Sequence, residues 1–198
     1  MSGDHGRSPA VRIGVTAAVV LGALTLAAAA FAEERFVVPR PDGWKLAFRA
    51  TQPKLSVTEF VPAAENVEEW TQMVTSQTFV GLRNVAVDGY LQRIAAEAKK
   101  VCDDVTVTPV EAGIHNGYPA AFMVQFCTRY AKTGKGEITL YKVIQGRDSL
   151  YIAYRSWRGA PFQRGAQPVP KADFDAWVDY LNGVTVCDTG DIERPCPN

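Results

Sequence analysis

Residues of the types that perform nucleophilic chemistry are scarce in this sequence and form no catalytic pattern. From residue 33 onwards the chain has one histidine, His115, in the turn-forming sequence HNGYP. A serine nucleophile needs a neighbouring base and often sits in the motif G-x-S-x-G, which the sequence lacks. Gly134-Lys135-Gly136 is too short to hold a phosphate and lies between predicted strands. We therefore predict that the protein is not an enzyme.

Carboxylate side chains occur in clusters that could, in principle, hydrolyse a glycoside or bind a metal ion. Those at 65–69 and 173–179 lie at the start or on the solvent face of predicted helices. Asp188, Asp191 and Glu193 lie between two cysteines and offer the oxygen ligands that calcium prefers. Their spacing has neither the glycine nor the twelve-residue frame of an EF-hand. We predict no metal site and no cofactor.

An even number of cysteines predicts two disulfide bonds if the chain is exported, and three connectivities are then open. Zinc binding or a redox pair is the alternative. The chain has no C-x-x-C motif, however, and has a single histidine after residue 32. We favour the pairs Cys102–Cys127 and Cys187–Cys196.

A basic and aromatic segment runs from Arg155 to Lys171 and contains no acidic residue. Arginine and aromatic side chains are enriched in protein interfaces and in their hot spots. We predict that the loop 158–167 contacts a partner through Arg158, Phe162 and Arg164. The alternative is an ordinary loop whose aromatic side chains pack on the sheet.

Residues 1–32 have the parts of a secretory signal peptide in the expected order. A basic start precedes an uncharged apolar run over 13–30, and the small residues Ala30 and Ala32 then form a cleavage site. An uncleaved membrane anchor is the alternative, because the uncharged stretch is just long enough to span about 30 Å of hydrocarbon. We favour cleavage, which places residues 33–198 in the periplasm or outside the cell.

Hydrophobic periodicity and turn signals predict one α+β domain over residues 33–198. Predicted strands lie at 44–51, 55–61, 105–111, 119–130, 137–145 and 150–157, with an edge strand at 184–186. Predicted helices lie at 67–79 with Asn66 as cap, at 89–101 with Asp88 as cap, and at 171–182. Three short loops between the four central strands indicate an antiparallel meander. Both faces of 119–130 mix apolar and polar residues, so helices should cover parts of each face.

A resemblance adds to this interpretation. The stretch Glu59-Phe60-Val61-Pro62, then Glu65, then Trp70 to Thr75, resembles a pattern in uncharacterised exported proteins of proteobacteria. The order of elements over 44–186 also resembles the PsbP-like α/β/α sandwich, which is named for an extrinsic subunit of photosystem II. The resemblance implies a non-enzymatic accessory role, often with docking on membrane complexes, and it identifies no functional residue.

The sequence thus predicts a non-enzymatic binding or accessory protein of the bacterial cell envelope, with a protein partner. Balanced charge, with 21 basic and 21 acidic residues, disfavours nucleic-acid binding. Membrane association would come through a partner or through an uncleaved N-terminal segment. A hydrolase with an unrecognised site and a carrier of an apolar ligand are the alternatives. A cleft lined by polar groups with perturbed pKa values would favour the hydrolase. An apolar cavity would favour the carrier.

Overall fold

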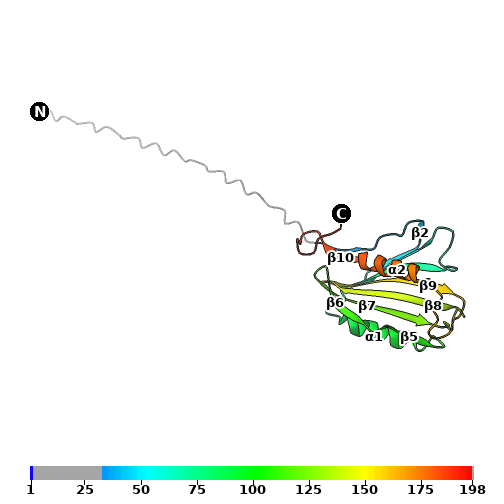
Figure 1. The fold of residues 1–198 in the computed structure, drawn as a ribbon. Coiled ribbons are helices and arrows are strands. Elements are labelled where there is room, and N and C mark those ends of the chain that lie inside the picture. The colour runs from blue at the N-terminus through cyan, green and yellow to red at the C-terminus, as the bar shows by residue number, and fades with distance from the viewer. Residues whose placement is uncertain (2–32, 198) are drawn as a thin grey trace. The chain divides into compact units, whose positions relative to one another are not determined.

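An antiparallel sheet of eight strands dominates the part of the chain that this computed structural model describes, which is Met1 and residues 33–197 (Figure 1). Its strands lie in the order β2, β3, β4, β9, β8, β7 and β5, and β6 also pairs with β7. A two-stranded sheet joins β1 to β10. The bounds are β1 (Glu34–Val37), β2 (Trp44–Gln52), β3 (Leu55–Pro62), β4 (Gln72–Val80), β5 (Val105–Val107), β6 (Glu111–His115), β7 (Tyr118–Cys127), β8 (Gly136–Gln145), β9 (Ser149–Gly159) and β10 (Thr185–Asp188).

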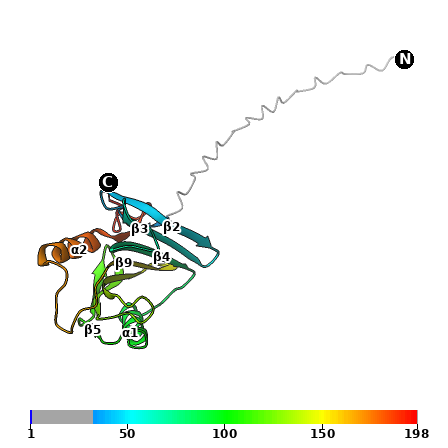
Figure 2. The ribbon, with the colours of Figure 1, turned by 90° about the vertical axis from the view of Figure 1, so that its right-hand side faces the viewer.

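Two helices, α1 (Val87–Ala98) and α2 (Lys171–Gly183), pack on opposite faces of the large sheet (Figures 1 and 2). Alternation along β7 makes both faces apolar. Met123 joins a core cluster with Leu91 of α1, whereas Val124 joins one with Trp177 of α2. The α+β class, the antiparallel meander and the helix cover on both faces are therefore confirmed.

One helix cannot cover a face of this width. A helix is about 10 Å across and neighbouring strands are about 4.8 Å apart, so one helix covers about two strands. The main contacts of α1 with the sheet are with β7 and β8. The same face of β9, β4 and β3 therefore extends beyond the helix.

The helix predicted over 67–79 is wrong, because most of that segment is the strand β4. A turn precedes β4, in which Asn66 Oδ1 accepts hydrogen bonds from the backbone N–H groups of Glu68 (3.0 Å) and Glu69 (2.8 Å). A helix start uses the same capping contact, so the cap residue marks a turn here. β4 is rich in β-branched residues and pairs with strands on both sides, and this pairing overrides the helical spacing.

Some element boundaries also differ from the prediction. The segment predicted as one strand over 105–111 belongs to two strands, β5 and β6, which pair with different parts of β7. Helix α1 begins at Val87 with Ala86 as its N-cap, so Asp88 lies in the first turn. Val101, expected in the buried stripe of this helix, is 40% exposed and lies beyond its end.

Two disulfide bonds join Cys102 to Cys127 and Cys187 to Cys196, the pairing favoured from the sequence. The first ties the segment after α1 to the end of β7. The second closes the C-terminal segment onto β10. Such bonds are typical of proteins that mature outside the cytoplasm.

The predicted signal peptide, residues 1–32 with Ala30 and Ala32, lies outside the described residues except for Met1. The first strand begins at Glu34, two residues after Ala32. Within residues 33–197, no helix has the length and apolar character needed to cross a membrane.

Candidate functional site

The three side chains predicted to bind a partner lie in different environments. Arg158 belongs to β9, which continues to Gly159, so its placement in a loop is wrong. Its Nε donates to Glu137 Oε1 at 2.9 Å, and its guanidinium carbon lies 3.8 Å from the centroid of the Trp70 ring. The Arg158 and Glu137 side chains are only 16% and 19% exposed. Arg158 is therefore a half-buried internal partner.

Phe162 and Arg164 also make internal contacts. The ring of Phe162 packs at the core beneath α2, with its centroid 6.2 Å from that of Trp157. Arg164 Nε donates to Asp104 Oδ2 at 2.8 Å, although the Arg164 side chain is 61% exposed. The predicted loop surface thus keeps one exposed cation, and that cation has a carboxylate partner.

The uncovered part of the α1 face forms an open groove of about 540 Å³, here named the α1-face groove. Its floor comes from β3, β4, β8 and β9, and α1 and the turn before β4 form its sides. This volume lies within the range of small-molecule sites. The lining residues are Glu59, Val67, Trp70, Met73, Thr75, Gln77, Tyr90, Ile94, Tyr130, Glu137, Thr139, Tyr141, Ile152, Tyr154, Ser156 and Arg158.

Strand register sets the central row of this floor. Glu59 of β3 pairs with Thr75 of β4, Thr75 pairs with Tyr154 of β9, and Tyr154 pairs with Tyr141 of β8. Paired residues in adjacent antiparallel strands point to the same face, so one row carries a carboxylate, an aliphatic hydroxyl and two phenols. The two tyrosine ring centroids are 5.4 Å apart.

Two further rows lie towards one end of the groove. In the first, Thr139 and Ser156 share a hydrogen bond of 2.9 Å between their hydroxyl oxygens. In the second, Glu137 pairs with Arg158 in register, and their side chains form the ion pair described above. These four polar side chains satisfy one another and leave the central row as the part open to new partners.

Burial controls the protonation of the central row. Desolvation raises the pKa of Tyr154 to about 12 and also raises the pKa of Tyr141, so both phenols keep their protons at neutral pH. Desolvation likewise raises the pKa of the Glu59 carboxyl. The row therefore presents hydroxyl groups beside one carboxylate that is costly to keep charged.

Two oxygen-bearing side chains in this row lack a partner. Glu59 makes no hydrogen bond or ion pair with the residues that the structure describes. Thr75 is fully buried, and its Oγ1 has no contact of hydrogen-bond geometry within the described chain. The Tyr154 hydroxyl is its polar neighbour, and the Thr75 hydroxyl lowers the pKa of Tyr154, against the larger effect of burial. Buried polar groups are normally satisfied, so this row is the candidate ligand site of the described chain.

The remaining residues weighed for chemistry lie elsewhere. His115 Nε2 is 3.4 Å from Lys142 Nζ, and Lys142 donates to the carbonyls of Leu181 (2.8 Å) and Val184 (2.7 Å) at the end of α2. Burial lowers the pKa of Lys142 to about 8. These contacts fix the end of α2 on the sheet.

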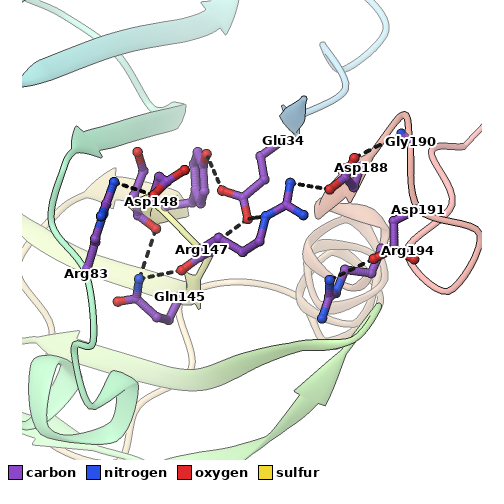
Figure 3. A network of polar contacts seen from close by, with 12 residues as sticks. Glu34, Arg83, Gln145, Arg147, Asp148, Asp188, Gly190, Asp191 and Arg194 are labelled. Atoms are coloured by element: carbon purple, nitrogen blue, oxygen red, sulfur yellow. Dashed lines mark hydrogen bonds and ion pairs between the residues drawn. The ribbon is translucent and has the colours of Figure 1, made fainter. Parts of the chain in front are cut away.

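The carboxylates near the C-terminus belong to an ion-pair network that joins three segments (Figure 3). Arg147, in the turn between β8 and β9, pairs with Asp188 of β10 and lies 3.5 Å from Glu34 of β1. Asp191 pairs with Arg194 at 2.8 Å. The two aspartates are therefore held by arginines, and in residues 33–197 no group of three metal-ligating side chains comes together.

Sequence reasoning singled out Arg158 as a partner-binding residue, and Arg158 lines the groove. It missed Glu59, Thr75 and Tyr154, because their proximity depends on the register of three strands distant in the chain. The run of four polar residues from Thr75 to Thr78, within a strand that pairs on both sides, is the signal that could have identified Thr75 and Gln77.

Comparison with known protein families finds no match, and comparison with curated proteins finds none either. Among solved structures, the chain is similar to LpqN, a protein involved in cell envelope biogenesis of Mycobacterium tuberculosis. The identity is 12% and the TM-score 0.39, over 80% of this chain and 87% of that chain. This likeness assigns no function, and the PsbP-like resemblance stays a prediction.

Proposed function

We propose that this chain is an exported, non-enzymatic binding protein of the cell envelope, and that it holds a small polar ligand in the α1-face groove. The observation that carries the proposal is the row of Glu59, Thr75 and Tyr154, in which two polar groups have no partner. Aromatic and aliphatic side chains around this row supply the apolar contact area that small-molecule sites share.

A hydrolase is the second candidate, because the raised pKa of Glu59 would suit a general acid. General-acid chemistry needs a complementary base or nucleophile. Glu137, the other carboxylate in the lining, is held by Arg158, and the lining tyrosines Tyr154 and Tyr141 keep their protons. The groove lining therefore favours binding over catalysis.

Two further roles receive less support. An apolar-ligand carrier would need an apolar cavity, and the space beside α2 lined by Phe126, Ile138 and Val169 measures only about 240 Å³. Docking of a protein partner on the predicted loop rests on Arg164 alone, since Arg158 and Phe162 are held internally. A partner that docks there should bind independently of the groove.

Filling the groove tests the proposal. Gln77 lies on the groove side of β4 and is half-buried, so Gln77→Trp places an indole over the central row. In a thermal-shift screen of small polar compounds, a true ligand should raise the Tm of the wild-type protein and have no effect on Gln77→Trp. Because Trp70 lines the groove, its fluorescence should report the same binding.

Thr51→Trp is the matched control, because Thr51 is exposed on the edge strand β2, outside the groove lining. It should bind as the wild type does. Mass spectrometry of the recovered compound separates the two candidates, since a binding protein returns it unchanged and a hydrolase returns its products. Equal binding by wild type and Gln77→Trp would contradict the groove as the site.

A further inference from the structure

The chemistry of the ligand follows from the charges in the α1-face groove, if the groove is the binding site proposed above. Its lining contains two carboxylates and one guanidinium. Arg158 and Glu137 neutralise each other, which leaves the Glu59 carboxylate as the uncompensated charge of the lining. A groove with this balance attracts a positive group.

Desolvation makes the charged form of the Glu59 carboxyl costly unless a positive group lies beside it. Glu59 is half-buried, and burial raises the pKa of its carboxyl. Within proteins, buried charges are normally paired or hydrogen-bonded. A ligand that brings a cation to Glu59 would supply the pair that the described chain does not.

The side chains around Glu59 suit an ammonium group. Thr75, its register partner, is fully buried, and its hydroxyl oxygen has no hydrogen bond of standard geometry within the described chain. Tyr154 and Tyr141 of the central row line the same groove, and the faces of aromatic rings attract cations. Phe48 of β2, opposite Glu59 in register and 44% exposed, offers apolar contact for a short alkyl chain.

We propose that the α1-face groove binds an organic amine, with the ammonium group held by the Glu59 carboxylate, whose register partner is the buried, unpartnered Thr75 hydroxyl. Three groups thus meet on one cross-strand row: the Glu59 carboxylate, the rings of Tyr154 and Tyr141, and the apolar side chain of Phe48. The site takes the amine as a small molecule, because the groove of about 540 Å³ has the size of a small-molecule site.

The test uses n-butylammonium chloride as the probe and n-butanol as its neutral counterpart. Titrations followed by NMR shifts of the tyrosine ring protons should give a millimolar Kd for the ammonium and no saturable shift for the alcohol. Glu59→Gln should weaken ammonium binding by about tenfold or more, because the charge is lost while the shape is kept. Glu111→Gln, at an exposed position on β6, should bind as the wild type does.

The thermal stability of Glu59→Gln without ligand is a second test of the proposal. Removal of an unpaired, half-buried charge should leave the Tm unchanged or raise it. Equal binding of the two probes, or unaltered ammonium binding by a folded Glu59→Gln, would overturn the proposal. If the ammonium fails to bind while another compound binds the wild type and not Gln77→Trp, the amine assignment fails and the proposed function stands.

An ammonium group also occurs in lipid headgroups, so a second arm uses vesicles. Vesicles of phosphatidylethanolamine with phosphatidylglycerol are compared with vesicles of phosphatidylglycerol alone. A free-amine site predicts no Glu59-dependent difference between them. Binding to the first vesicles only, lost in Glu59→Gln, would assign the ammonium to a headgroup and overturn the small-molecule assignment.

Discussion

At the scale of single residues, Arg158 shows how position decides what a charged side chain can do. Its guanidinium has the Trp70 ring on one side and the Glu137 carboxylate as its ion-pair partner. A partner protein would have to break both contacts to use this charge. Arg158 is therefore better understood as the support for one end of the groove than as a hot spot of an interface.

Removal of the Arg158 side chain should destabilise the fold. Arg158→Ala leaves Glu137 without its counter-charge in a mostly buried position, and we expect a loss of about 1–3 kcal/mol in the free energy of unfolding. Arg164→Ala should change it by less than about 0.5 kcal/mol, because the Arg164 side chain is 61% exposed. Urea unfolding of the two variants measures the difference, and equal effects would contradict this account.

At the scale of elements, the sequence predicts best where local signals decide. The short turns around Gly134 and Gly146 specify hairpins, so β7, β8 and β9 follow in the predicted order. The segment of Trp70 and Met73 has helical spacing, yet pairing of β4 between β3 and β9 decides its structure. The groove could not be predicted, because it depends on which strands one short helix leaves uncovered.

Burial of Lys142 beside the end of α2 makes the stability of the fold depend on pH. Lys142 has a pKa of about 8 in the folded protein, below its ordinary value of 10.5. Between these values the unfolded chain binds more protons, so the free energy of unfolding should rise with pH, by at most about 1.4 kcal/mol per pH unit. The raised pKa values of the buried tyrosines act in the opposite direction only above about pH 10.

Lys142→Met should remove this rise, because methionine fills the space and does not titrate. Urea unfolding at pH 7.5, 8.5 and 9.5 gives the comparison. Lys132→Met is the control, since Lys132 is exposed and should leave the pH dependence unchanged. A wild-type protein with constant stability over this interval would show that Lys142 keeps an ordinary pKa.

At the scale of the whole molecule, the first strand, β1, is held by the rest of the fold. The Glu34 carboxylate is 8% exposed, accepts a hydrogen bond from the backbone N–H of Arg147 at 2.6 Å, and accepts another from the Tyr151 hydroxyl at 3.3 Å (Figure 3). Cleavage after Ala32 would leave Glu34 in place. Cleavage only a few residues later would remove it.

We therefore expect the mature protein to begin at Glu33. Intact-mass measurement of the protein recovered from the periplasm or the medium checks this. Replacement of Ala32 by a bulky residue should block processing, because the signal peptidase requires small side chains at its site. Recovery of a membrane-bound chain that retains residues 13–32 would establish the anchor instead.

The pairing of β1 with β10 has a consequence for the order in which the protein can fold. These strands lie near opposite ends of the chain, and Glu34 pairs with Asp188 in register. A chain that crosses a membrane from its N-terminus delivers β10 last. In a chain exported in this direction, the sheet of β1 and β10 can therefore form only after almost the whole polypeptide has been delivered.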